Sequence, residues 1–160
     1  MEQYTVIYGE QVTIDDIAEA IMLDKMVYDE EYHVTISQCL AWYNRNSQIY
    51  IMVKDNRTRK IVAYVNVSPV TDEYYEKIRS GEFIDSFLPP EAVVGYDFPD
   101  TYNLYFSSIV VHPNYQSTTV FLTLFNTLTE RFLSLGKNDI LIKRIVADAV
   151  SEKGEKFCRG

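Results

Sequence analysis

The sequence predicts a single α+β domain in which a mixed central sheet is flanked by helices, in the three-layer α/β arrangement. Two observations carry this prediction. Residues 49–67 hold two alternating apolar segments on either side of a polar turn, a pattern typical of a hairpin. Residues 103–111 are almost continuously apolar and lead into a long segment of helical periodicity, as expected for a strand buried on both faces. At 160 residues and 18.6 kDa, the chain suits one domain, spanning 1–160.

The first third of the chain is predicted to form a short strand and two helices. Thr5–Tyr8 is a strand candidate that Gly9 ends. Thr13 precedes an isoleucine and two acids, which is a helix-start signature, and apolar residues then follow at helical spacing. Thr35 can cap a second helix over residues 36–44.

The middle of the chain is predicted to form a hairpin, a short helix and a long irregular connection. The hairpin joins Ile49–Lys54 to Lys60–Val67, and Asp72–Arg79 is a short amphipathic helix. Residues 81–102 contain three of the five prolines and several aromatic residues. A connection of that length in one domain is usually functional or disordered. Its aromatic content predicts an ordered lid that covers the substrate side of a cleft.

The last third is predicted to alternate strands and helices. Asn103–Val111 is the predicted central strand, and Ser117–Leu135 is a long helix with Gly136 as its C-cap. Asp139–Val146 is a further strand, and Ser151 begins a last helix.

Composition and charge limit the classes of partner. The net charge of −8 and the pI near 4.7 argue against nucleic acid or an anionic membrane as a general partner. They are compatible with an amine-bearing substrate, and also with an acidic surface that serves solubility alone. The two cysteines, Cys39 and Cys158, show no metal-type spacing, so neither a zinc site nor a disulfide framework is expected. We see no apolar run of membrane-spanning length and expect a cytoplasmic protein.

The segment from Tyr105 to Leu128 carries the main functional signal. An apolar strand ends at Val111, a turn follows through Pro113, and a helix opens at Ser117. The start of a helix presents backbone N–H groups and a partial positive charge, so it can hold a phosphate without a basic side chain. The N–H groups expected to do so belong to Gln116, Ser117, Thr118, Thr119 and Val120.

This order of residues resembles the cofactor-binding segment of the GNAT superfamily of N-acetyltransferases, roughly V-x-P-x-x-(Q/R)-G-x-G-(x)-(G/A). Val111, Pro113 and Gln116 match the pattern, whereas Ser117 and Thr119 replace the two glycines and Phe121 replaces the small residue. The resemblance implies that the turn binds the pyrophosphate of acetyl-CoA. The predicted order of strands and helices follows the same family over nearly the whole chain.

The end of the chain extends the resemblance. The family often has N-x-x-A-x-x-L-Y after its penultimate strand, and the same spacing here gives Ser151-x-x-Gly154-x-x-Phe157-Cys158. The resemblance implies that Ser151 contacts the pantetheine arm or the adenine end, and that Cys158 protonates the departing CoA thiolate. The family continues into further strands, so we expect a GNAT-like domain that lacks the last strands and is truncated at its C-terminus. The exposed sheet edge would make a homodimer possible.

The resemblance also implies where acetyl transfer would occur. Backbone groups of Ile109, Val110 and Val111 would hold the thioester and the pantetheine amides. Ser107 stands where many members carry a glutamate base, and Tyr105, on the same strand face, could order a water. The residues expected at the acceptor end are His33, Tyr96 and Asp97.

Three interpretations remain open from the sequence. The first is an N-acetyltransferase that uses acetyl-CoA, without a metal, to modify a small-molecule or peptide amine. The second is a GNAT-like domain that has lost catalysis and serves binding or regulation, which the replaced glycines, Ser107 and Cys158 would favour. The third is an unrelated α+β ligand-binding domain, which the strand–helix order makes the weakest.

Overall fold

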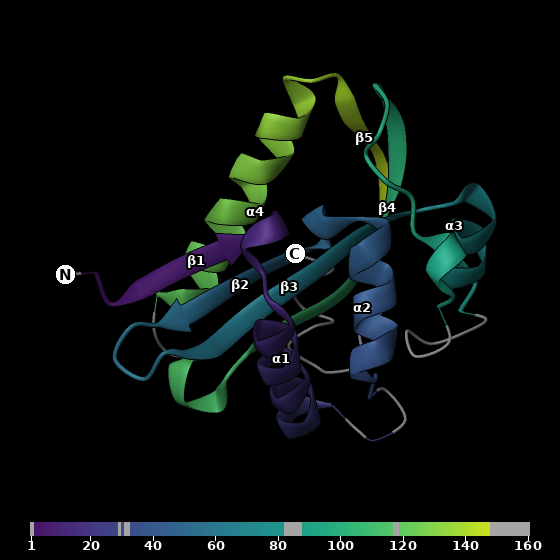
Figure 1. The fold of residues 1–160 in the computed structure, drawn as a ribbon. Helices are drawn as coiled ribbons and strands as arrows, with labels where there is room; N and C mark the ends of the chain where they lie inside the picture. Colours follow the sequence, from purple (N-terminus) through teal and green to yellow (C-terminus); the bar gives the residue numbers. More distant parts are fainter. Residues whose placement is uncertain (1, 29, 31–32, 82–87, 117–118, 148–160) are drawn as a thin grey trace.

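The structure of the protein is a computed structural model that describes residues 2–28, 30, 33–81, 88–116 and 119–147. Figure 1 shows a twisted sheet with helices on both of its faces. The strands are β1 (Tyr4–Tyr8), β2 (Tyr50–Asp55), β3 (Lys60–Val70), β4 (Asp100–Val111) and β5 (Ile140–Ala147), and the α-helices are α1 (Ile14–Val27), α2 (Ile36–Arg45), α3 (Asp72–Arg79) and α4 (Val120–Gly136).

The sheet is mixed, as the sequence predicts. Its strand order is β1-β2-β3-β4-β5, in which the first four strands are antiparallel to their neighbours and β5 runs parallel to β4. β4 is paired on both sides, so the prediction of an interior strand is confirmed, although β3 occupies the middle of the order. The parallel pairing requires a crossover, and α4 supplies it.

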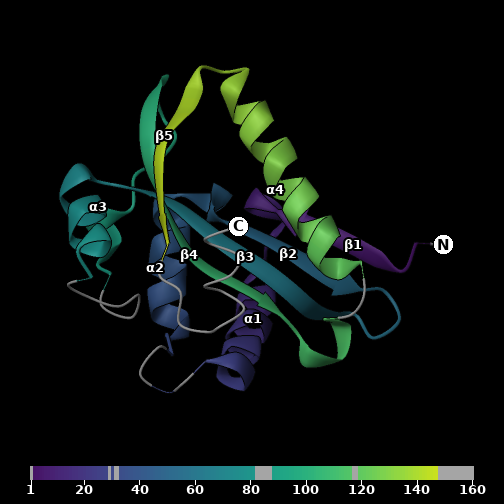
Figure 2. The same ribbon diagram turned by 180° about the vertical axis from the view of Figure 1, so that it is seen from behind.

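The helices divide between the two faces of the sheet. α1 and α2 cover one face, and α4 crosses the other, as the two opposite views show (Figures 1 and 2). Ile17 and Ile21 of α1 and Trp42 of α2 pack into the first core cluster. Leu124 and Leu128 of α4 pack against β2 and β3 in the second. Each helix therefore buries one apolar stripe, the solution expected for amphipathic helices on a sheet.

The caps that the sequence predicts for α1 and α2 are present. The Thr13 hydroxyl accepts from the Asp16 N–H at 3.2 Å, while the Asp16 carboxylate accepts from the Thr13 N–H at 2.9 Å. Thr35 and Gln38 form the same reciprocal pair at the start of α2. These bonds satisfy backbone donors that a helix start leaves without an intrahelical partner, which fixes where each helix begins.

α4 begins later than the sequence predicts. Its first residue is Val120 rather than Ser117, because Pro113–Tyr115 form a single 3-10 turn after β4. Ser117 and Thr118 lie outside the described residues. The end of the helix is as predicted, since Gly136 is its last residue.

The structure does not support the predicted lid for the described part of the long connection, residues 88–99. The Trp42 indole N–H donates to the Leu88 carbonyl at 2.9 Å, and Val93 forms a bridge with Val70 at the end of β3. These contacts hold the connection at the end of the sheet opposite to the start of α4, where Val111 pairs with Ala63. The segment completes the core at that end instead. Residues 82–87 lie outside the described chain.

Leu124 gives a test of the α4 interface. Its side chain is fully buried against the sheet. Leu124→Ala should lower the free energy of unfolding by about 2–5 kcal/mol, since truncation removes apolar burial and leaves a cavity. Urea unfolding followed by circular dichroism measures the change. Leu122→Ala is the control on the same helix, where the side chain is 59% exposed, and it should change stability by less than about 0.5 kcal/mol.

Candidate active site

The second half of β4 is the part of the sheet that can accept a ligand. Asn66 pairs with Ser108 but Val67 pairs with Phe106, so Ser107 is an extra residue that forms a β-bulge. β5 pairs with β4 from Asp100 to Phe106, and its described part ends there. Within the described chain, the stretch of β4 after the bulge therefore has a strand partner only on the β3 side.

The pairing with β3 determines which backbone groups face the open side. The His112 N–H donates to the Val62 carbonyl at 2.8 Å, so Val110, two residues earlier, also directs its backbone toward β3. Ile109 and Val111 alternate with it and direct their N–H and C=O groups to the open side. Of the three predicted backbone sites, Ile109 and Val111 are suitably oriented. The backbone groups of Val110 belong to the ladder with β3, so the structure offers no support for its role, which stays a prediction.

Side chains of the protein itself reach the open side. The Tyr28 hydroxyl, just after α1, donates to the Ile109 carbonyl at 3.3 Å. The Gln116 amide Nε2 donates to the Val111 carbonyl at 3.3 Å. Both contacts agree with the pairing of β3 and β4, which directs the Ile109 and Val111 carbonyls away from β3. We call the Ile109 and Val111 backbone groups the open edge of β4.

The start of α4 lies at the same end of β4 as the open edge. The Tyr115 hydroxyl donates to the Asp55 carboxylate at 2.6 Å, which ties the turn after β4 to the end of β2. Thr119 is the exposed N-cap of α4 and makes no side-chain capping hydrogen bond, whereas Val120 is fully buried. The Phe121 ring stacks on the Phe125 ring one turn further along, with ring centroids 6.4 Å apart.

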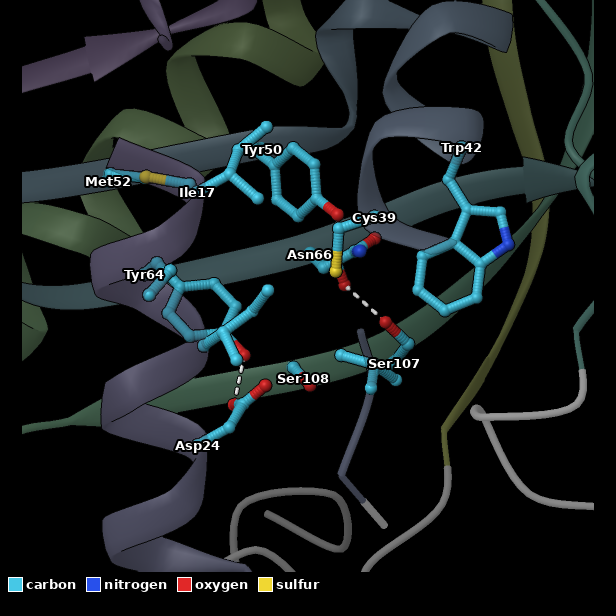
Figure 3. Close-up of a pocket in the computed structure, with 13 residues that line it drawn as sticks. Ile17, Asp24, Cys39, Trp42, Tyr50, Met52, Tyr64, Asn66, Ser107 and Ser108 are labelled. Atoms are coloured by element: carbon cyan, nitrogen blue, oxygen red, sulfur yellow. Dashed lines mark hydrogen bonds between the residues drawn. The ribbon is translucent and has the colours of Figure 1, made fainter. Parts of the chain in front are cut away.

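A small cavity lies behind the bulge, between the sheet and the two helices α1 and α2 (Figure 3). Its volume of about 20 Å³ is room for one water molecule. Polar groups from five elements, α1, α2, β2, β3 and β4, converge on it, together with apolar side chains of α1 and α2. The polar residues of the lining are Asp24, Cys39, Tyr50, Tyr64, Asn66, Ser107 and Ser108.

A buried carboxylate is the most unusual group of this cavity. Asp24 is only 5% exposed, and the Tyr64 hydroxyl of β3 donates a hydrogen bond to it. The Ser108 side chain of β4 lies beside Tyr64 in the same cavity and opposes the rise of the Tyr64 pKa. Burial raises the pKa of Asp24 to about 6, against the opposing effects of the Tyr64 hydrogen bond and of the nearby His33. The same burial, with the Asp24 charge, raises the pKa of Tyr64 well above its usual value, so Tyr64 keeps its proton.

The structure brings only some of the predicted site residues together. The His33 ring Nε2 donates to the Tyr28 carbonyl at 2.8 Å and lies close enough to Asp24 to affect its charge, so His33 belongs to this neighbourhood. Tyr105 is 1% exposed within the first core cluster, and this burial favours a packing role over ordering a catalytic water.

The remaining predicted residues lie elsewhere. Tyr96 packs beside Leu128 and Phe132, in the second half of α4, and Asp97 is exposed in the same connection. Neither lines the cavity that His33 adjoins. Ser151 and Cys158 fall outside the described residues, and their roles stay predictions.

Sequence reasoning missed Asp24, although a signal for it exists. Asp24 follows Ile17 by seven residues and Ile21 by three, so it occupies the apolar stripe that faces the sheet. An acid on that stripe must be paired or have a shifted pKa. Its partner Tyr64 gave no comparable signal, since a tyrosine in a strand is ordinary.

The described residues offer neither a metal centre nor a membrane-spanning helix. In that part of the chain, no group of three or more His, Cys, Asp or Glu residues is placed to hold a metal ion. None of the helices described has both the length and the apolar character to cross a bilayer.

The fold is that of the GNAT acetyltransferases, as comparison with solved structures shows. The loading GNATL domain of CurA from Lyngbya majuscula matches with a TM-score of 0.65 and 11% identity, over 97% of this chain and 69% of that one. Ard1 from Thermoplasma volcanium matches with a TM-score of 0.61 and 8% identity, over 99% and 80%. The sequence itself matches no family model and no curated protein.

A third similar structure is part of a much larger protein. It is the glucosamine N-acetyltransferase region of a fungal multi-domain GH3 β-N-acetylglucosaminidase, with a TM-score of 0.58 and 14% identity. The match covers 99% of this chain but 16% of that chain. These structures confirm the fold that the sequence resemblance implied, at identities too low to carry over a substrate.

The raised pKa of Asp24 predicts how stability depends on pH. The folded state binds the proton of the Asp24 carboxyl more tightly than the unfolded state does. At pH 4 and below, the folded protein therefore holds this carboxyl in its neutral form and does not bury a charge. Between pH 4 and about 6 the wild type loses stability, because above the folded pKa it must bury a charge. Asp24→Asn removes that cost, and its amide oxygen can still accept from Tyr64.

Asp24→Asn should therefore gain stability relative to the wild type as pH rises from 4 to 7. A pKa change from 3.8 to about 6, at about 1.4 kcal/mol for each pH unit, limits the gain to about 3 kcal/mol. Urea unfolding of both proteins at pH 4, 5, 6 and 7 measures it. A stability difference that stays constant with pH would contradict the assignment of the shift to Asp24.

Proposed function

We propose that this chain is an N-acetyltransferase that moves the acetyl group of acetyl-CoA to an amine. The observation that carries the proposal is the position of the open edge of β4 directly before the start of α4. The open edge supplies backbone donors and acceptors in a line. The helix start supplies N–H groups and positive potential for phosphates a few residues further on. An extended ligand with amides at one end and a pyrophosphate at the other fits that order.

The residues present fit acetyl-CoA despite three changes from the usual motif. Ser117 and Thr119 replace glycine, and each keeps its N–H and adds a hydroxyl donor, although a Cβ limits how closely phosphate approaches the backbone. Thr119 is exposed and open to a ligand. The Phe121 ring stacks on Phe125 along the helix, which supports a turn that this ring leaves open.

In this proposal each group has a defined task. Ile109 and Val111 align the pantetheine amides through their backbone groups, and the start of α4 holds the pyrophosphate. The acceptor amine approaches the thioester carbonyl at the bulge, on the side of α1 and α2. Cys158 remains the proposed donor of a proton to the departing thiolate, and Ser151 a proposed pantetheine or adenine contact; both rest on the resemblance. The acceptor is a small-molecule or peptide amine, with which the net charge of −8 is compatible.

Thr119→Glu tests the phosphate site without weakening the helix. A negative charge at a helix N-cap interacts favourably with the helix dipole, so stability should be unchanged or slightly higher. The same charge should repel the pyrophosphate and weaken acetyl-CoA binding by about tenfold or more, a loss of at least about 1.4 kcal/mol. Isothermal titration calorimetry measures the affinity.

Thr129→Glu is the control for this experiment. Thr129 is exposed on the same helix but lies more than two turns from its start. Acetyl-CoA affinity should be unchanged in this variant. An equal loss of affinity in both variants would indicate a general charge effect and would count against the site. Tight binding by the wild type without transfer to any amine would favour the catalytically inactive alternative.

Tyr28→Phe tests the open edge. Its hydroxyl occupies the Ile109 carbonyl that the pantetheine is proposed to use, so the ligand must displace it. Removing the hydroxyl should tighten acetyl-CoA binding about two- to tenfold, because a net hydrogen bond contributes about 0.5–1.5 kcal/mol. Calorimetry again gives the result. Weaker binding in this variant would mean that Tyr28 contacts the ligand rather than competing with it.

A further inference from the structure

The chain carries a buried carboxylate connected to its proposed reaction centre by hydroxyl groups. Asp24 accepts from the Tyr64 hydroxyl, and the Ser108 hydroxyl lies beside Tyr64 in the same cavity. Ser108 directly follows the bulge residue Ser107 and precedes Ile109 on the open edge. All four polar side chains, from Asp24 to Ser107, line one cavity (Figure 3). The connection therefore runs from the bulge of β4, across β3, to α1.

We propose that Asp24 is the base that takes the proton of the acceptor ammonium, through the hydroxyls of Ser108 and Tyr64. The proposal rests on the acetyltransferase function proposed above. It assigns to α1 a role that the sequence resemblance would place on β4, where Ser107 cannot act as a base.

Two hydroxyl groups pass the proton of the ammonium to Asp24. The ammonium gives its proton to the Ser108 oxygen, Ser108 gives its own to Tyr64, and Tyr64 gives its own to Asp24. Both hydroxyls end unchanged, the amine is neutral, and Asp24 is a carboxylic acid. The amine then forms the N–C bond, the C–S bond breaks, and the second proton of the nitrogen goes to the departing sulfur. Asp24 afterwards returns its proton to solvent.

The surroundings of Asp24 support this role over a purely structural one. A buried carboxylate held only for structure would be expected to form an ion pair with a lysine or an arginine, as Asp16 on the same helix does with the Lys54 ammonium at 3.2 Å. Asp24 instead faces Tyr64 of β3, Tyr28 and His33 after α1, Cys39 of α2 and Tyr50 of β2. A pKa of about 6 lets the carboxylate be ionised at neutral pH and still hold a proton during the reaction.

The test compares two probe nucleophiles that differ in their need for a base. Ethylamine is almost fully protonated at pH 7 and must lose a proton before it attacks, whereas hydroxylamine is largely neutral and need not. CoA release from acetyl-CoA is followed with each probe at saturating concentration. Asp24→Asn and Tyr64→Phe should each lower the rate with ethylamine about 10²–10⁴-fold. The rate with hydroxylamine should change less than about threefold in both.

The pH dependence gives a second readout. In the wild type the rate with ethylamine should rise with pH through about 6, because Asp24 must be ionised to act. In Asp24→Asn this titration near pH 6 should be absent, and the rate should instead follow the neutral fraction of ethylamine, which keeps rising well above pH 6. Asp16→Asn is the matched control, since Asp16 is equally buried on the same helix but lies outside the cavity. It should keep both rates and the pH profile of the wild type.

The outcomes separate this inference from the proposed function. Equal loss with both nucleophiles in Asp24→Asn and Tyr64→Phe would show a structural effect and overturn the inference, as would full activity with ethylamine. Acetyl-CoA binding by calorimetry is measured on the same samples. Wild-type protein that binds acetyl-CoA but transfers to neither probe overturns the role of Asp24 as base, while failure to bind acetyl-CoA overturns the proposed function itself.

Discussion

The bulge at Ser107 is the constraint on which the rest of the site depends. One extra residue in β4 shifts the pairing with β3, so the alternation of side chains and backbone groups restarts after Phe106. Before the bulge, β4 is paired on both sides. After it, Ile109 and Val111 face a side where β5 is not described as a partner, and Ser107 and Ser108 line the cavity instead. Without the bulge, the regular ladder would orient these same residues differently.

The buried charge of Asp24 lowers the stability of the fold, and the apolar core of the sheet compensates for it. Keeping Asp24 ionised in a buried position opposes folding, and the Tyr64 hydroxyl and the His33 imidazole moderate that cost. The core on the two faces of the sheet offsets it. Fully buried residues such as Val53, Leu104 and Leu124 lie in the cluster under α4, on the face away from Asp24. This division lets one face of the sheet carry packing while the other carries polar groups.

Most of the fold was predictable because its signals are local. The Thr13 and Thr35 caps and the hairpin each depend on residues close together in sequence, and each is confirmed. The start of α4 was placed three residues early, since the 3-10 turn after Pro113 looks like a helix start in sequence. The described part of the predicted lid lies elsewhere for a different reason: aromatic residues such as Tyr96 indicate burial but not which side they cover.

The site was less predictable than the fold because it depends on contacts between distant residues. The pair of Asp24 and Tyr64 joins residues 40 positions apart, and nothing in the sequence of either specifies the other. The orientation of Val110 toward β3 follows from the register of two strands, which the sequence leaves undetermined. Asp24 on the apolar stripe of α1 was the one part of the pair that the sequence could have revealed.

The same side chains that shape the site also occupy it. Tyr28 and Gln116 donate to the carbonyls of the open edge, and the cavity behind the bulge has room for a single water. A ligand must therefore replace contacts of similar kind rather than fill an empty groove. A ligand can shift the protein between two conformations only by as much as its affinities for the two differ. Because the ligand would replace one hydrogen bond of the Ile109 or Val111 carbonyl with another, a small net gain in binding free energy is enough to expose the open edge.

Tyr28 also connects the open edge to Asp24. The Tyr28 N–H donates to the Asp24 carbonyl at 2.8 Å, and the Tyr28 carbonyl accepts from His33. Movement of Tyr28 away from β4 would thus act directly on the residues that hold Asp24, which couples occupation of the open edge to the state of the proposed base.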